Sequence, residues 1–331
     1  MRVMFGTYPW AHETPGGGEI QLQKYAECLP GHGVEVTRHD PWRANLDPSS
    51  VFHFFSCIGG SYHFCNYIRQ RGLPLVISSS LWITEATKAD YPIGEIRDQL
   101  ALADVIVTNS DTESDQLAHI LALPRARFLA VLNGFDARFA NAEPTLFRDT
   151  FGIDGPFILN VGNIEPRKNQ LLLARAAKRL ELPLVLIGHP RNAAYADQVM
   201  AEGGSAVRYL GPIDHLDPLL SSAYAACAVF ALPSTLETPG LAALEAAAAG
   251  APIVVTAEGS TRDYFADHAH YVDPRNCENL IRSVDAALKA GPNLALKAHA
   301  AATLNWTTVT QALLPIYRQA VQRRDQRLSP G

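Results

Sequence analysis

Residues 235–250 read T-L-E-T-P-G-L-A-A-L-E-A-A-A-A-G and follow a short apolar run at 229–232 that a proline ends. An apolar run of this length, bounded by a turn residue, is typical of a buried strand. A helix is predicted to follow, because Thr238 can cap it, Pro239 suits its first position and Gly250 can end it. The stretch therefore predicts a strand that leads into a helix, as in α/β folds.

Two carboxylates accompany this helix, Glu237 just before it and Glu245 inside it. The neighbours of Glu245 are almost all Ala and Leu, and a helix that is apolar all round is usually buried. A buried carboxylate without a partner is costly, and its side chain should lean back over Leu241 and Ala242 toward the helix start. Both acids would then flank backbone N–H groups that favour anions, with Gly240 permitting close approach. Such a structure can hold a phosphate on its amides and sugar hydroxyls on its carboxylates.

The spacing Glu237-x7-Glu245, with Pro239-Gly240 inside it, resembles the signature of retaining glycosyltransferases of family 4, which have the GT-B fold. The resemblance implies that Glu237 meets the hydroxyls of a donor sugar and Glu245 meets the nucleotide ribose. It also implies that the intervening segment, Thr238, Pro239, Gly240 and Leu241, meets the diphosphate. The alternative is a buried helix with one incidental Glu and a solvated Glu in the loop before it.

Length and composition limit the other classes of function. A chain of 331 residues exceeds one typical core, which predicts two domains, and its 47% hydrophobic and 18% charged residues are ordinary for a globular protein. A formal charge of −5 argues against a nucleic-acid partner. We find no signal peptide and no apolar run long enough to span a bilayer, and acidic residues outnumber basic ones over residues 1–148. We therefore expect a cytoplasmic protein whose membrane contact, at the inner face, is at most peripheral.

The cysteines do not indicate a disulfide framework or a zinc site. They are odd in number and form no C-x-x-C pair, so we expect reduced, mostly buried thiols and no structural metal. The five are Cys28, Cys57, Cys65, Cys227 and Cys277.

Apolar runs alternate with amphipathic segments along the chain, the pattern of doubly wound α/β domains, in which ligands bind beyond the carboxyl ends of the strands. With the resemblance, this predicts a GT-B fold: two Rossmann-like domains facing a cleft, with a C-terminal helix crossing back to the first. The expected domains are residues 1–150 for the acceptor, 151–305 for the nucleotide sugar, and the helix 306–325; the polar end, 323–331, is expected to be frayed. The predicted strands are 2–6, 34–38, 51–57, 75–79, 105–108, 127–132, 157–161, 184–187, 207–210, 229–232 and 253–256.

Two loops of the first domain are candidates for ligand contacts. Pro15-Gly16-Gly17-Gly18-Glu19 precedes a helix expected at 20–29, and it resembles the glycine-rich loop that family 4 enzymes place beside the donor diphosphate. The second loop presents Ser61, Tyr62 and His63 after a strand, as an acceptor surface or merely as the start of a helix at 64–71. A flexible surface turn is the alternative for the glycines.

Two further loops bear on the reaction centre. Many family 4 members carry a His after the strand that here reads P-L-V-I-S-S, and the matching position is Ser80. Either Trp82, Glu85 or a residue elsewhere replaces that His, or donor recognition differs. Asn133-Gly134-Phe135-Asp136 is similar to the Asn-Gly-Val-Asp segment that closes the first domain in this family and faces the cleft. Residues 137–155 would then form a linker.

In the second domain, Gly162-Asn163-Ile164-Glu165-Pro166-Arg167-Lys168 follows the strand at 157–161 and precedes a helix expected at 170–180. It resembles the family's Gly-Arg-Leu-x-x-x-Lys-Gly motif, with Asn163 in place of Arg, and implies that Arg167 and Lys168 bind the donor phosphates. Pro212 and Ile213 lie where relatives cover the nucleotide base. Exposed cations at a helix start are the alternative.

The resemblance implies a retaining transferase that moves a sugar from a UDP- or GDP-linked donor to a carbohydrate, lipid-linked or small-molecule acceptor. Arg167, Lys168 and Glu237 are the expected catalytic residues, and the cations replace a divalent ion, so no metal is expected. A nucleotide-sugar 2-epimerase would need an acid/base set that we do not find, and a solute-binding protein would need an export signal. A noncatalytic nucleotide-sugar-binding subunit is the alternative that Ser80 motivates.

Overall fold

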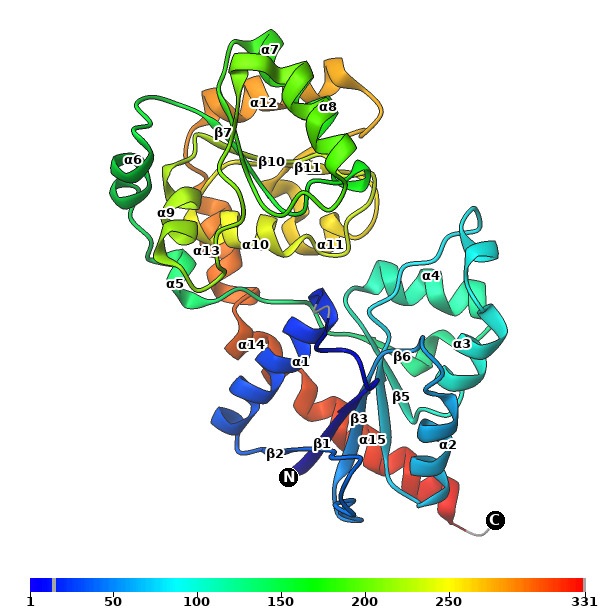
Figure 1. Ribbon diagram of the computed structural model, residues 1–331. Coiled ribbons are helices and arrows are strands. Elements are labelled where there is room, and N and C mark those ends of the chain that lie inside the picture. The colour runs from blue at the N-terminus through cyan, green and yellow to red at the C-terminus, as the bar shows by residue number, and fades with distance from the viewer. Residues whose placement is uncertain (14–15, 330–331) are drawn as a thin grey trace. The chain divides into compact units, whose positions relative to one another are not determined.

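A computed structural model of the chain describes residues 1–13 and 16–329, so Pro15 of the glycine-rich loop lies outside the described residues. The chain divides into two compact units, Met1–Asn133 with Trp306–Gly331 and Gly134–Asn305. Each unit contains one six-stranded parallel sheet covered by helices (Figure 1). The prediction of two Rossmann-like α/β domains is confirmed.

The sheet of unit 1 has the strand order β2-β1-β3-β4-β5-β6. Its central strands are buried on both faces, which explains why they read as continuous apolar runs in the sequence. The strands are β1 (Arg2–Thr7), β2 (Glu35–Arg38), β3 (Val51–Phe55), β4 (Leu75–Ser78), β5 (Val105–Thr108) and β6 (Phe128–Ala130).

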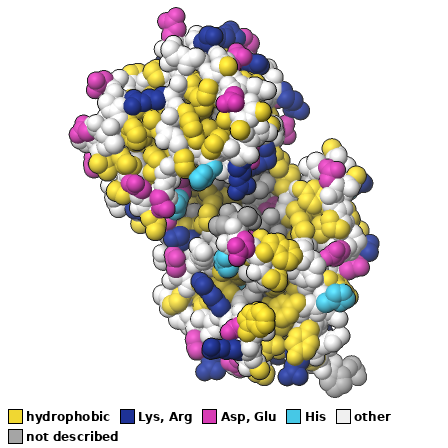
Figure 2. Space-filling view, in the orientation of Figure 1, with side chains coloured by type: hydrophobic (Ala, Val, Ile, Leu, Met, Phe, Trp, Pro, Cys, Tyr) yellow, Lys and Arg dark blue, Asp and Glu magenta, His cyan; other side chains and the backbone are white. Residues whose placement is uncertain are grey.

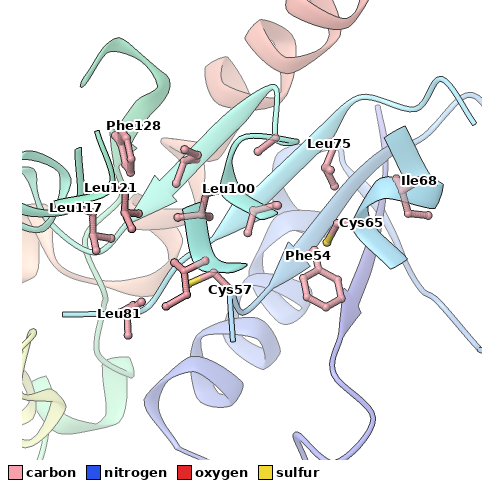
Figure 3. Close-up of a cluster of buried hydrophobic side chains, with 14 of the residues drawn as sticks. Phe54, Cys57, Cys65, Ile68, Leu75, Leu81, Leu100, Leu117, Leu121 and Phe128 are labelled. Atoms are coloured by element: carbon pink, nitrogen blue, oxygen red, sulfur yellow. The ribbon is translucent and has the colours of Figure 1, made fainter. Parts of the chain in front are cut away.

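Helices cover both faces of this sheet. On one face, Phe54, Leu75 and Phe128 pack with Cys65 and Leu117 from the helices into one apolar cluster (Figure 3). This core holds the carboxyl ends of β3, β4 and β5 in fixed register, which positions the loops that follow them. The helices of unit 1 are α1 (Gly17–Cys28), α2 (Tyr62–Gln70), α3 (Ile93–Leu100), α4 (Asp111–Leu121), α14 (Trp306–Gln311) and α15 (Leu313–Leu328).

The C-terminal helix α15 packs against β3, β4 and β5, so the end of the chain belongs to unit 1. Buried His53 joins helix to sheet, because its Nδ1 lies 2.9 Å from the Tyr317 hydroxyl and its Nε2 lies 2.9 Å from Ser78 Oγ. The prediction of a frayed end from residue 323 is wrong for the described residues. Arg323 donates to the carbonyl of Asp104 at 2.9 Å and Arg327 pairs with its carboxylate at 3.3 Å, so polar side chains hold this end in place.

The sheet of unit 2 has the order β12-β11-β10-β7-β8-β9. All of its strands were predicted from the sequence except β12, which is three residues long and begins with a half-buried His270. The strands are β7 (Ile158–Val161), β8 (Leu184–Ile187), β9 (Val207–Tyr209), β10 (Val229–Leu232), β11 (Ile253–Thr256) and β12 (His270–Val272).

Two expectations for unit 2 differ from the structure. Residues 137–155, expected as a linker, contain α5 and α6, and α6 packs against α9 within this unit. The helix expected to start at Pro239 starts at Leu241. The helices are α5 (Ala137–Ala140), α6 (Thr145–Phe151), α7 (Gln170–Leu180), α8 (Ala193–Gly203), α9 (Pro218–Ala226), α10 (Leu241–Ala249), α11 (Thr261–Phe265), α12 (Cys277–Ala290) and α13 (Leu294–Thr303).

The surface and the cysteines agree with the composition. None of the five cysteines, all of which lie in the described part of the chain, forms a disulfide, and Cys57, Cys65 and Cys227 are buried, as expected. Charged side chains of both signs are interspersed over the face shown in Figure 2. Among the described residues, no helix is both long and apolar enough to span a membrane.

Candidate active site

The site in unit 2 is built from loops at the carboxyl ends of β7, β8, β10 and β11, which meet at one edge of the parallel sheet. The loop after β7 bonds to the loop after β8 through the Ile164 N–H and the His189 carbonyl, 2.8 Å apart. It bonds to the loop after β10 through the Thr235 N–H and the Arg167 carbonyl, also 2.8 Å apart. The Asn169 side chain donates to the Pro233 carbonyl at 3.0 Å. These bonds fix the loop that carries the two predicted cations.

Lys168 and Glu237, far apart in sequence, form the centre of this site. Lys168 Nζ lies 2.6 Å from Glu237 Oε1, and the two side chains are 14% and 5% exposed. Arg167 lies 3.7 Å from the same oxygen and also pairs with Glu165 at 3.1 Å. Within the described chain, Oε2 of Glu237 accepts no hydrogen bond. The structure thus brings the three predicted catalytic residues together and leaves one carboxylate oxygen able to accept a hydroxyl.

The backbone of Glu237 is held by the loop after β11. Its N–H donates to the Glu258 carbonyl at 3.2 Å, and its carbonyl accepts from the Ser260 N–H at 3.0 Å. Gly259 between them has a φ of +100°, and a Cβ there would lie 2.1 Å from the Glu237 carbonyl oxygen. Only glycine fits this position without displacing Glu237.

Helix α10 begins beside this carboxylate. Gly240, with a φ of +75°, is its N-cap, and the Thr238–Pro239 peptide bond before it is cis. The predictions that Thr238 caps the helix and that Pro239 opens it are therefore wrong, because the chain turns at these residues before Gly240 starts the helix. The first-turn N–H groups of Leu241 and Ala242 have no carbonyl partner within the helix, and their partial positive charge favours an anion.

Glu245, on the next turn of α10, is buried with two partners that the sequence analysis did not identify. His215 Nε2 lies 2.7 Å from its Oε1, and the Tyr224 hydroxyl donates to its Oε2 at 2.7 Å. Arg138 Nη2 in turn lies 3.0 Å from His215 Nδ1. Burial and the nearby Glu245 carboxylate raise the pKa of Tyr224 well above its usual value. These partners explain how the apolar helix tolerates a carboxylate, and neither has a local sequence signal.

Of the remaining donor-site candidates of unit 2, Gly162 and Asn163 lie on the loop after β7, whereas Pro212 and Ile213 lie on the loop after β9. Gly162, with a φ of +150°, follows β7, and a Cβ on the facing Gly188 would lie 2.0 Å from the Gly162 carbonyl oxygen. The Asn163 carbonyl accepts from the side chain of buried Gln170 at 2.9 Å. Pro212 is exposed and Ile213 half-buried in the loop after β9.

In unit 1, the glycine-rich segment is less of a loop than expected. Gly17 and Gly18 form the first turn of α1, and Gly16 is its N-cap. The Gly16 N–H donates to Glu19 Oε2 at 2.7 Å, and Glu19 Oε1 accepts from the Tyr8 hydroxyl at 2.8 Å. The Gly16 N–H is therefore already hydrogen-bonded to the Glu19 carboxylate.

Ser80 and Asn133 join a polar network around buried Gln21. Ser80 adopts a φ of +44° and donates to Gln21 Oε1 at 3.3 Å, and Asn133 Oδ1 accepts from Gln21 Nε2 at 2.7 Å. Asn133 is thus a buried residue that links the segment after β6 to α1 through this hydrogen bond. Trp82 is half-buried, and its Nε1 has no hydrogen-bond partner within the described chain.

Ser61, Tyr62 and His63 lie at the start of α2, which begins at Tyr62. Ser61 is the buried N-cap residue, Tyr62 is half-buried and His63 is exposed. Tyr62 and His63 therefore form the first turn of a helix that begins two residues earlier than the expected start at 64.

Glu113, a buried carboxylate that was not predicted from the sequence, joins the loop after β4 to the loop after β5. Glu113 near the start of α4 accepts from Ser79 Oγ at 2.8 Å and from the N–H groups of Leu81 at 3.2 Å and Asn109 at 3.0 Å. Burial raises its pKa to about 7, although these hydrogen bonds oppose the shift. Across residues 1–13 and 16–329, no group of three or more His, Cys, Asp or Glu residues could hold a metal ion.

Solved structures share this architecture. A glycosyltransferase of Rickettsia africae aligns over 97% of this chain and 98% of its own with a TM-score of 0.75 and 13% identity. Anabaena Alr3699/HepE, solved in complex with UDP and glucose, aligns over 96% and 99% with a TM-score of 0.72 and 17% identity. At such identities the likeness shows the fold, which is GT-B.

Sequence relatives then show the family. Residues 146–303 match the family described as Glycosyl transferases group 1, which confirms the resemblance predicted from the sequence: the chain is of the group 1 glycosyltransferase type. The D-inositol 3-phosphate glycosyltransferase of Geodermatophilus obscurus is 34% identical over 263 residues, 70% of this chain and 57% of that protein. That of Mycobacterium avium is 30% identical over 264 residues, 72% and 61% respectively. The chain thus spans less than two thirds of these curated relatives.

Proposed function

We propose that this chain is a retaining glycosyltransferase that moves a sugar from a UDP- or GDP-linked donor to a carbohydrate, lipid-linked or small-molecule acceptor. The observation that carries the proposal is the Lys168–Glu237 pair beside Arg167 and the start of α10. Two cations and a helix start converge where a diphosphate would sit, next to a carboxylate oxygen that can accept a sugar hydroxyl. The family match of this unit and the UDP bound to Anabaena Alr3699/HepE support the same class of donor.

The proposed chemistry needs no protein nucleophile. The acceptor oxygen forms a bond to C1 of the sugar on the face from which the C1–phosphate oxygen bond breaks, and the acceptor's proton passes to the departing phosphate. Lys168, Arg167 and the N–H groups of Gly240 and Leu241 stabilise the negative charge of the diphosphate as it leaves. Glu237 orients the sugar and Glu245 the ribose, since a carboxylate with two partners still has lone pairs for hydroxyls. The cations fill the role of a divalent ion, so we propose that no metal is required.

A test is transfer from a panel of UDP- and GDP-sugars in EDTA, with the product's anomeric configuration read by NMR. Turnover with retained configuration supports the proposal. Inverted configuration, or turnover that EDTA abolishes and Mg²⁺ restores, would contradict it.

A noncatalytic nucleotide-sugar-binding subunit is the second candidate, because Ser80 stands where many relatives carry a His and its hydroxyl already bonds to Gln21. It predicts donor binding without turnover with any acceptor. A Ser80→His variant that gains turnover from an inactive parent would favour this candidate.

A further inference from the structure

Unit 1 contains a cavity of about 550 Å³ beyond the carboxyl ends of β1 and β3, and Ser61 is its one described lining residue for which a ligand contact was predicted. Its walls are mainly rings and apolar side chains: Phe5, Tyr8, Trp10, Leu22, Phe54 and Phe64. The volume falls within the range of about 300–1,000 Å³ typical of small-molecule sites, and such sites are mostly apolar with a few polar groups. A sugar can stack the C–H face of its ring on one aromatic side chain, but its hydroxyls would then face the other apolar walls of this cavity.

The mouth of the cavity carries an exposed aromatic ring. Trp10 is 53% exposed and packs edge-on against Tyr8, with ring centroids 5.4 Å apart. Gly59 passes close to it, since a Cβ at Gly59 would lie 3.4 Å from Trp10 Cζ2. On the wall, His39 stacks on Phe64 with an interplanar angle of 30°. Flat rings that border an open cavity favour a flat apolar ligand, which would cover them from water.

Arg38 is the one formally charged side chain of the described cavity lining. Arg38, His12 and His39 line the cavity, and no Asp or Glu is among its described lining residues. Arg38 is exposed and, within residues 1–13 and 16–329, forms no ion pair. An unpaired guanidinium beside an apolar cavity can pair with a carboxylate or phosphate on the ligand.

The cavity also adjoins the predicted donor contacts of this unit. Tyr8 lines both this cavity and a second one of about 180 Å³, which Gly18 and Ser80 also line. A ligand whose apolar body fills the larger cavity can therefore present a hydroxyl past Tyr8 toward Gly18, predicted to lie beside the donor diphosphate, and toward the cleft candidate Ser80.

We propose that this cavity binds the acceptor of the transferase, a small molecule with a flat aromatic body, an anionic group that pairs with Arg38, and the hydroxyl that is glycosylated. This inference rests on the proposed function. It differs from what the relatives' names would suggest, because D-inositol 3-phosphate has an anion but no apolar body.

The test is calorimetric titration of the full chain with 2-naphthyl phosphate, 2-naphthol, inorganic phosphate and D-inositol 3-phosphate. We expect 2-naphthyl phosphate to bind most tightly. Arg38→Ala should weaken 2-naphthyl phosphate by up to about fivefold, the range of an exposed charge pair, and leave 2-naphthol unchanged. Trp10→Ala should weaken both by about tenfold, because both ligands cover the ring.

Matched controls are Arg71→Ala and Trp42→Ala, which remove an exposed Arg and a 92% exposed Trp of unit 1 from outside the cavity lining. They should leave all four titrations unchanged. No binding of either naphthyl ligand, equal losses in the controls, or tighter binding of D-inositol 3-phosphate would overturn the inference.

Titration of UDP, GDP and ADP in parallel separates this inference from the proposed function. Nucleotide binding without naphthyl binding would leave the transferase proposal standing and overturn the acceptor. Naphthyl binding without any nucleotide binding would remove the transferase and with it the acceptor role. In the transfer assay, Trp10→Ala should raise the KM for an aromatic acceptor and leave the KM for the donor unchanged; a change in the donor KM alone would contradict the assignment.

Discussion

Replacing Lys168 by Met should have two separable effects, one on stability and one on nucleotide binding. Lys168 Nζ is 2.6 Å from Glu237 Oε1, and Glu237 is only 5% exposed, so the variant leaves a buried carboxylate with Arg167 at 3.7 Å as its remaining charged partner. Breaking a buried pair costs about 3–5 kcal/mol, and the remaining Arg167 and partial exposure reduce our expectation to about 1–3 kcal/mol. Each kcal/mol corresponds to about 2–4 °C in Tm for a unit of 150–250 residues.

The effect on binding arises from a different contact. A charge-assisted hydrogen bond to a diphosphate contributes about 1.5–3 kcal/mol, so Lys168→Met should weaken a nucleoside diphosphate roughly 10- to 100-fold. The double variant Lys168→Met/Glu237→Gln has no unpaired buried charge, so it should recover much of the lost stability and none of the lost affinity.

Urea unfolding and calorimetric titration measure these two effects. The matched control is Lys289→Met, which removes an ion pair of the same 2.6 Å length to Asp285 in which Lys289 is 75% exposed. It should change stability by less than about 1 kcal/mol and leave affinity unchanged. Wild-type nucleotide affinity in Lys168→Met, or a double variant less stable than the single one, would refute the reasoning.

Gly259→Ala should destabilise unit 2 and weaken nucleotide-sugar binding, because its Cβ would lie 2.1 Å from the Glu237 carbonyl oxygen. The control Gly291→Ala, also at positive φ but in open space, should change only stability. Equal losses of binding in both variants would contradict this. Glu245→Gln should weaken free nucleotide by about tenfold through the ribose, and unchanged affinity would contradict the assignment. Burial raises the pKa of Glu113 from 4.5 to about 7, so in this pH range the folded state holds a proton that the unfolded chain has released. As the pH rises from 4.5 to 7, wild type should therefore lose about 3 kcal/mol of stability relative to Glu113→Gln. Urea unfolding should measure the difference in unfolding free energy between wild type and variant. Buried His53, with its pKa lowered to about 3, makes both proteins more stable as the pH rises to 6.5, so its effect cancels in that difference. A difference independent of pH would contradict the Glu113 account.

The strands could be predicted from the sequence because a buried parallel strand is a continuous apolar run with turn residues at its ends. Strand β12 could not be predicted in this way, because its three residues, His270–Val272, form no apolar run and are defined as a strand by their pairing with β11. The first residue of α10 was also mispredicted, at Pro239 instead of Leu241. Proline at a helix start is a general preference, whereas the turn through Thr238 and Pro239 depends on Gly240 and on the contact with Gly259.

The site was predictable where a motif fixed it and unpredictable where long-range packing did. Lys168 and Glu237 stood out as a cation and an acid at strand ends, and β7 and β10 are neighbours in the sheet. His215 and Tyr224 carry no such signal, because only the packing of α9 and its preceding loop against α10 makes them partners of Glu245. The cavity of unit 1 combines three strands and two helices, so no single stretch of sequence indicates it.

The most direct test of the central claim, that unit 2 holds the nucleotide of a sugar donor without a metal, is calorimetric titration of UDP, GDP and ADP in EDTA. We predict that UDP or GDP binds at one site and that Lys168→Met weakens it as worked out above. Failure of all three to bind, or binding only when a divalent ion is added, would contradict the claim.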